Sequence, residues 1–169
     1  MARLALFAAV ALLLAACGFE LRGEPSVGLR TLYVSSNVPS TVVADVRRIL
    51  ATGPTHLVAN PKDAEASLTI LAESREKTVH TITGSVRVYE FQLRLTVSYQ
   101  LTAPGREEPV IAPTELSTTR LITYSESAPT AKEAEEQLLY KDMRADLAGR
   151  ILRQVAVARR ESAAAFAPR

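Results

Sequence analysis

Cys17 is the one cysteine in this chain of 169 residues, and its thiol is a side chain that can be modified covalently. It directly follows Leu14-Ala15-Ala16, so an aliphatic residue and two small residues precede the thiol. This pattern is a lipobox. A signal peptidase must grip extended backbone just before the bond that it cuts, and small side chains leave room for that grip. The sequence therefore predicts cleavage before Cys17 and a lipid on its sulfur.

The residues before the lipobox have the layout of a secretory signal peptide. Arg3 supplies a positive charge and residues 4–13 supply an apolar run. The alternatives are an ordinary buried cysteine and a short transmembrane helix, but the run is too short to cross a hydrocarbon core of ~30 Å. We expect residues 1–16 to be the signal peptide and residues 17–28 a lipidated tether. Apart from this covalent lipid, no cofactor is expected.

The charge balance argues against a nucleic-acid partner. The chain has 20 Lys and Arg against 18 Asp and Glu, and removal of Arg3 with the signal leaves 19 against 18. A nucleic-acid binder would show a concentrated basic excess. Once Cys17 is modified, no cysteine remains for a disulfide, so an apolar core alone must stabilise the fold.

Residues that could support catalysis are few. His56 and His80 are the two histidines, and their spacing does not match a zinc site. Two pairs of neighbouring glutamates could be considered as paired carboxylates: Glu73 with Glu76, and Glu135 with Glu136. A solvated face is the simpler interpretation of these pairs, and no Gly-rich phosphate loop is present. We therefore predict that the chain is not an enzyme and holds no metal.

A strict alternation over residues 89–101 is the clearest structural pattern. Its apolar members are Tyr89, Phe91, Leu93, Leu95, Val97, Tyr99 and Leu101. Polar residues lie between them, so the strand buries one face and leaves the other wet or in contact with a partner. A slip of one residue would bury Glu90 and Arg94, which fixes the register of this strand.

The other elements complete a two-layer arrangement. Strands are expected at 32–35, from 67 towards 82, and at 115–124. Apolar residues at helical spacing predict helices over 42–51, with Ser40 as a candidate N-cap, and over 130–158. Both helices must bury their apolar stripes against the single apolar face of the sheet.

The predicted fold is therefore α+β: a two-layer α/β sandwich of about four strands in a mixed sheet, with two helices on one face, in the order β-α-β-β-β-α. Residues 29–158 should form this single domain, and residues 159–169 a disordered C-terminal tail. The order of the strands does not follow from the sequence.

Three segments resemble the lipopolysaccharide-assembly lipoprotein family LptE. The first is residues 17–23. The family opens with Cys-Gly, then an aromatic residue, then a position that is usually His, then Leu-Arg, and in this chain Glu20 occupies the position of that His. The second is Tyr89-Glu90-Phe91, which resembles a Glu-aromatic segment on the family's long strand. The third, residues 131–143, resembles the start of the family's last helix.

The resemblance implies a non-catalytic role in the cell envelope. Proteins of this family plug the large outer-membrane β-barrel LptD, assist its assembly and take part in delivering lipopolysaccharide to the outer leaflet. Gly18 follows the cysteine, whereas lipoproteins that are retained at the inner membrane usually have Asp at this position. The resemblance therefore implies an outer-membrane lipoprotein. It would face the periplasm or lie inside the barrel lumen. The alternative is a periplasm-facing lipoprotein that binds a small ligand or scaffolds another envelope complex.

Lipopolysaccharide carries phosphates, which Arg and Lys bind through charge-assisted hydrogen bonds. Candidates are the cations near expected strand ends and at the start of the last helix: Arg75, Lys77, Arg87, Arg120 and Lys132. Three of them surround a turn at Gly84, and Lys132 matches a basic position in the family's helix start. The alternative for each is a solubilising surface charge.

The lipobox yields a first prediction. Cys17→Ala should leave an unacylated precursor, because no other thiol is available for the lipid. The measurement is fractionation of cells that lack the barrel partner, with membranes washed in high salt. Wild-type protein should stay with the outer membrane and the variant should not. A variant that remains there after the wash would show that the anchor is elsewhere.

Overall fold

The computed structural model describes residues 27–82, 88–124 and 129–162. In chain order, its elements are β1 (Thr31–Ser36), α2 (Val42–Ala51), β2 (His56–Leu57), a 3-10 turn (Pro61–Asp63), β3 (Ala66–Ile82), β4 (Val88–Thr102), β5 (Ile111–Thr123) and α3 (Pro129–Glu161). The predicted signal peptide, Cys17 and most of the tether lie outside the described residues. So does the predicted turn at Gly84.

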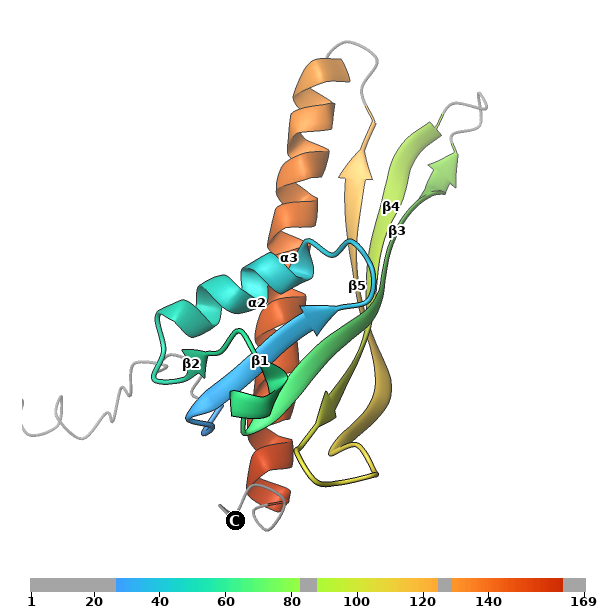
Figure 1. The fold of residues 1–169 in the computed structure, drawn as a ribbon. Coiled ribbons are helices and arrows are strands. Elements are labelled where there is room, and N and C mark those ends of the chain that lie inside the picture. Colours follow the sequence, from blue (N-terminus) through green and yellow to red (C-terminus); the bar gives the residue numbers. More distant parts are fainter. Residues whose placement is uncertain (1–26, 83–87, 125–128, 163–169) are drawn as a thin grey trace, which may run out of the picture.

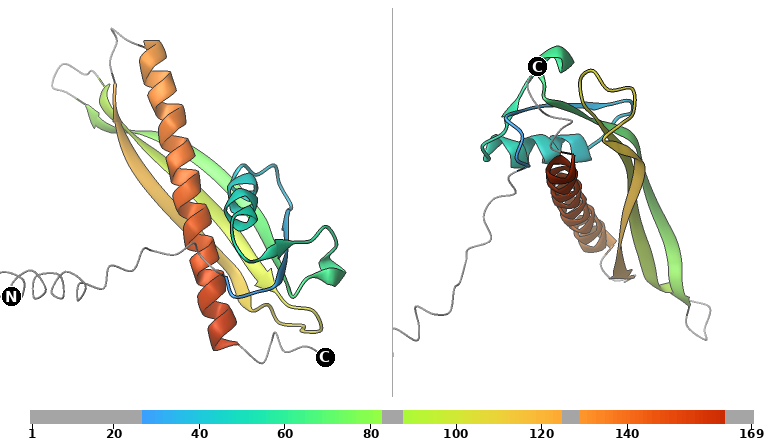
Figure 2. Two further views of the ribbon diagram at one scale, coloured as in Figure 1. Left: turned by 90° about the vertical axis from the view of Figure 1, so that its left-hand side faces the viewer. Right: turned by 90° about the horizontal axis from the view of Figure 1, so that it is seen from below.

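The strands form one open mixed sheet in the order β2-β1-β3-β4-β5 (Figure 1). Strand β1 pairs in parallel with both β2 and β3, whereas β3-β4 and β4-β5 are antiparallel. The predicted α+β sandwich is confirmed, with both helices on one side of the sheet (Figure 2). The sheet has a fifth strand, β2, that the sequence did not predict. With two residues, β2 is too short to produce an alternating pattern.

Strand β4 has the predicted register. Leu93, Leu95, Val97 and Leu101 have no exposed surface, while Arg94 between them is exposed. The apolar side faces α2 and α3, whose buried residues belong to the same core. Fully burying side chains of this size stabilises a fold by about 1.5–3 kcal/mol each. The burial of alternate residues is therefore what fixes the orientation of the sheet.

A bulge in β3 changes which residues face the helices. Ile70 pairs with Tyr99, but Ala72 pairs with Ser98, so Leu71 is an extra residue on the β3 side. Before the bulge the even-numbered Leu68 and Ile70 are buried. After it the odd-numbered residues of β3 take the helix side, opposite the buried leucines of β4. The bulge thereby turns three charged residues towards the helices: Glu73, Arg75 and Lys77.

Helix α3 is longer than predicted and is tied to α2. It starts one residue earlier and ends at Glu161, so residues 159–161 of the predicted disordered tail are helical. At the other end of the domain, Val27 of the predicted tether is buried in the core. Between the helices, Asp45 of α2 pairs with Arg48 and lies 3.4 Å from Nε of Arg144 on α3. Asp45 is 8% exposed, so this charge contact lies within the interface between the two helices.

The Glu73 carboxylate caps α2 from the neighbouring strand. Its Oε2 accepts hydrogen bonds from the Thr41 and Val42 N–H groups, at 2.9 and 3.1 Å, and from the Ser40 hydroxyl at 2.7 Å. The first N–H groups of a helix have no partner within the helix, and a negative charge there is favourable. The predicted cap, Ser40, contributes a longer bond from the Val43 N–H at 3.4 Å. The interpretation of Glu73 as a solvated carboxylate was wrong, since its side chain is 6% exposed.

These bonds set the ionisation of Glu73. Burial by itself raises the pKa of the carboxyl group, but the hydrogen bonds from Thr41, Ser40 and Val42 favour the charged form and together lower the pKa below 4.5. A carboxyl group whose pKa is lower in the folded state stabilises the fold above its unfolded pKa. That stabilisation disappears as the pH falls through the folded pKa.

Glu73→Gln should lower the free energy of unfolding by about 1–3 kcal/mol at pH 7, because one charged acceptor of several hydrogen bonds is replaced by an amide. The difference from wild type should shrink as the pH is lowered below 4.5. Urea unfolding across pH 3–7 measures it. Glu76→Gln is the matched control, since Glu76 is exposed on the same strand. Equal stability of the two variants at pH 7 would contradict the capping role.

Candidate functional site

The side of the sheet away from the helices is a broad polar surface, which we call the outer face. Its residues alternate with the buried residues of β3, β4 and β5, and cross-strand pairing places them in rows. Two central rows are Ser74–Thr96–Ser117 and Glu76–Arg94–Thr119. In the described part of the chain no α-helix packs on this face (Figure 2). Most of its side chains carry hydroxyl, amide or charged groups, but Leu121, which is 52% exposed, and the smaller Ala72 are apolar members of this face.

Four of the five basic candidates lie on the opposite side, next to α3. Pairing places Lys77, Leu93 and Arg120 in one row across three strands, and Leu93 is buried on the helix side. Arg75 occupies the next row, opposite Leu95. Lys132 comes from the first turns of α3. We call Arg75, Lys77, Arg120 and Lys132 the basic cluster. The structure brings them to one side of the sheet.

Lys77 connects β3 to α3. Its Nζ lies 2.6 Å from Oε2 of Glu136 and 4.6 Å from the centre of the Phe91 ring. Phe91 in turn contacts Tyr124 edge-to-face, with ring centres 5.9 Å apart. The side chain of Lys77 is 42% exposed, so the ion pair is partly screened by water. Glu136 is therefore not simply part of a solvated face, as the sequence suggested.

Arg75 is held by contacts within the domain. Its guanidinium donates to the Thr41 hydroxyl at 2.8 Å, lies 3.6 Å from Glu73 and sits 5.3 Å from the centre of the Tyr140 ring. Burial and the nearby Glu136 raise the pKa of Tyr140. Arg75 thus supports the cap of α2, and its loss would disturb the fold as well as any ligand contact.

The remaining candidates are also engaged. Lys132 Nζ lies 2.8 Å from Oε2 of Glu135 and 3.2 Å from the Thr123 hydroxyl. Arg120 folds back onto β5, where it donates to the Thr119 carbonyl at 2.8 Å. Arg87 and the lipidation candidate Cys17 lie outside the described residues. Sequence reasoning did not pair Lys77 with Glu136, because β3 and α3 are far apart in the chain. It also missed the pair of Lys132 with Glu135, although the two residues are three positions apart on α3.

The described residues give no support for a metal site or a membrane-spanning helix. Over 27–82, 88–124 and 129–162, no group of three or more His, Cys, Asp and Glu side chains is placed to hold a metal. Both histidines are exposed. Within the same ranges, no helix is long and apolar enough to cross a membrane.

Comparison with known proteins points to one family. The family model LptE, described as lipopolysaccharide-assembly, matches residues 29–155. The LPS-assembly lipoprotein LptE of Yersinia enterocolitica is 30% identical over 151 residues, which cover 86% of this chain and 71% of that protein. The protein of the same name from Pectobacterium atrosepticum is 28% identical over 148 residues, covering 85% of this chain and 79% of that protein.

Solved structures agree with this match. An uncharacterized lipoprotein B from Nitrosomonas europaea superposes with a TM-score of 0.72 at 31% identity, covering 86% of this chain and 94% of that one. The rare lipoprotein B from Shewanella oneidensis gives a TM-score of 0.68 at 25% identity, covering 78% of this chain and 97% of that one. Both similarities extend over the sheet and the helices rather than over one local motif.

Proposed function

Because this chain belongs to the LptE lipopolysaccharide-assembly family, we propose that it is an outer-membrane lipoprotein that plugs an LptD-type β-barrel and assists its assembly. Members of this family are not enzymes, so the role is one of binding and support. The proposal includes the lipid on Cys17 as the anchor and lipopolysaccharide as the transported partner. The protein would face the periplasm or lie inside the barrel lumen.

The observation that carries this proposal is the uncovered outer face. The interior wall of a large outer-membrane barrel is polar, and Ser, Thr and Gln side chains can exchange hydrogen bonds with such a wall. The face is also long: β3 has 17 residues, and at 3.2–3.4 Å per residue it extends roughly 55 Å. That exceeds the apolar band of a barrel, about 25 Å tall. A domain of this shape fits lengthwise within a barrel lumen.

Disruption of the outer face tests the barrel proposal. Thr96 and Ser117 are cross-strand neighbours near its middle, so Thr96→Arg with Ser117→Arg should block close approach of a wall while leaving the core intact. Co-purification with the co-expressed barrel from outer membranes should fall at least tenfold. The melting temperature of the double variant must stay near that of the wild type for the loss to be assigned to the outer face.

Ala44→Arg is the matched control, because Ala44 is exposed on α2, away from the outer face. Its co-purification should remain within twofold of wild type. If the double variant recovers the barrel at wild-type yield, the outer face is not the contact surface. Equal loss in the control would mean that the contact is not confined to that face.

Contact with lipopolysaccharide is a separate part of the proposal, assigned to the basic cluster. Lys77 and Lys132 each have N–H donors besides those used in their ion pairs, and their side chains are 42% and 26% exposed. A phosphate group could replace Glu136 as the partner of Lys77, and Glu135 as the partner of Lys132. The nearby Phe91 and Tyr124 rings would provide apolar contact beside the charges.

Lys77→Ser with Lys132→Ser should reduce capture of purified lipopolysaccharide several-fold, because two phosphate-binding charges are removed. Association with the barrel should be unchanged. Arg75 is left in place because it supports the cap of α2. Lys62→Ser with Lys141→Ser is the control, as both lysines are exposed elsewhere. Unchanged capture by the first variant would remove these lysines from the mechanism.

A further inference from the structure

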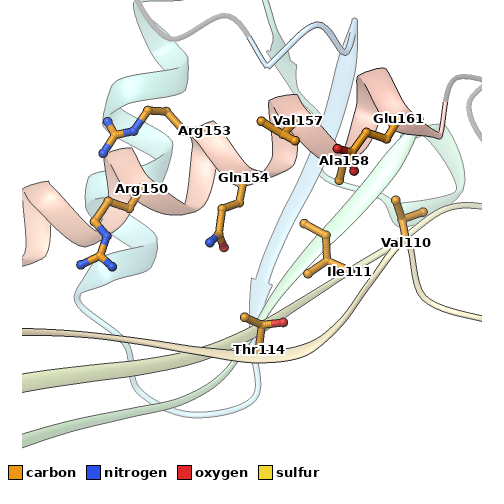
Figure 3. A pocket seen from close by; sticks show the side chains of 9 residues that line it. All are labelled: Val110, Ile111, Thr114, Arg150, Arg153, Gln154, Val157, Ala158 and Glu161. Atoms are coloured by element: carbon orange, nitrogen blue, oxygen red, sulfur yellow. The ribbon is translucent and has the colours of Figure 1, made fainter.

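An open groove lies far from the basic cluster, between the start of β5 and the second half of α3. It has a volume of about 610 Å³, and its walls include Val110, Ile111, Arg150, Arg153, Val157 and Glu161 (Figure 3). Along α3, Arg150 follows Lys132 by 18 residues, or roughly 27 Å of helix. The groove is therefore a separate feature from the basic cluster, and it does not belong to the outer face.

The two ends of the groove carry opposite charge. Arg150 and Arg153 lie at one end and Glu161 at the other (Figure 3). Arg150 donates one hydrogen bond, to the Ser117 carbonyl at 3.0 Å, and keeps further N–H groups available. Among the described residues, neither Arg153 nor Glu161 takes part in an ion pair within 4.0 Å. A ligand with both charges would meet a partner at each end.

The stretch between the charges is apolar with polar groups at its centre. Val157 is 49% exposed, and Val110 and Ile111 are partly buried against the core. Gln154 and Thr114 also line the groove. The Tyr99 hydroxyl donates to Oε1 of Gln154, which leaves the amide nitrogen of Gln154 free to donate to a ligand. The groove therefore offers aliphatic contacts and hydrogen-bond donors side by side.

The neighbouring edge of the sheet is not itself open for strand addition. Arg150 donates a hydrogen bond to the Ser117 carbonyl, and Arg120 donates one to the Thr119 carbonyl. Pro113, near the start of this strand, has no N–H to offer. Such protection is usual for long edge strands, so a ligand in the groove must be recognised mainly through its side chains.

We propose that this groove binds an extended peptide segment of a partner protein, with an acidic residue at one end, a basic residue at the other and aliphatic residues between. Carboxylate and guanidinium form charge-assisted, bidentate hydrogen bonds, which suits the Arg150–Arg153 end. Glu161 would repel a second anion and attract a Lys or Arg. An acyl chain fits less well, because it would offer no acceptor to the amide nitrogen of Gln154 and no positive charge to Glu161.

The dimensions agree with a short segment. From Arg150 to Glu161 is 11 residues of helix, or roughly 16 Å. Five residues of extended peptide reach about 17 Å. An interface of this size is small, so transient binding is expected.

A set of labelled pentapeptides tests the proposal on the full mature, acylated protein in detergent, by fluorescence anisotropy. Each peptide carries a charged residue at both ends and Val-Thr-Val between them, with all four combinations of Asp and Lys. The two peptides of mixed charge should bind at least tenfold more tightly than those with two like charges. Equal affinities, or no binding by any of the four, would overturn the proposal.

Variants then locate the binding site. Arg153→Ser, alone and with Arg150→Ser, should weaken binding of the mixed-charge peptide, the pair by at least tenfold. Arg160→Ser is the matched control on the same helix, since Arg160 is exposed and does not line the groove. Glu161→Lys should shift the preference to the peptide with Asp at both ends. Melting temperatures identify any variant whose loss reflects unfolding.

Two outcomes would overturn the peptide assignment. Equal weakening by Arg160→Ser would mean that general positive charge attracts the peptide. Arg-dependent binding of laurate, with no preference among the peptides, would instead make the groove a site for an anionic amphiphile.

Discussion

The position of one carboxylate holds the architecture together. Glu73 belongs to β3, yet it accepts the hydrogen bonds of the unpaired N–H groups at the start of α2 and draws Arg75 beside it. Helix α2 is thereby fixed on the sheet, and α3 is fixed on α2 through Asp45 and Arg144. A short helix of 10 residues is marginal in isolation. Its capping and packing are therefore what make the helical layer a rigid part of the domain.

The bulge at Leu71 is what brings Glu73 into that position. Without the extra residue, the register of β3 would continue with even-numbered residues on the helix side, and Glu73, Arg75 and Lys77 would lie on the outer face. The bulge thus does two things at once. It supplies charged groups to cap α2 and pair with α3, and it leaves the outer face of β3 with small polar side chains such as Ser74 and Thr78.

This separation gives the domain surfaces of different chemistry. The outer face is rich in hydroxyl groups. The basic cluster lies on the helix side with acidic and aromatic neighbours, so a phosphate would have to compete with Glu135 and Glu136. The groove near the end of α3 carries charges of both signs. One sheet and one long helix are therefore enough to present three chemically different surfaces.

The sequence by itself determined the fold class and the register of β4, because alternation over 89–101 and helical spacing are local patterns that burial enforces. The family came from the three segments that resemble LptE. The sequence also placed the last helix nearly correctly. Only the tertiary structure decided the partners of Glu73 and Lys77, since these contacts join segments that are distant in the chain. Strand β2 was not predicted, because a strand of two residues is too short to show an alternating pattern. The bulge was not predicted because one extra residue in a polar stretch leaves no hydrophobic signal, although it reverses the face of the residues from Ala72 to Val79.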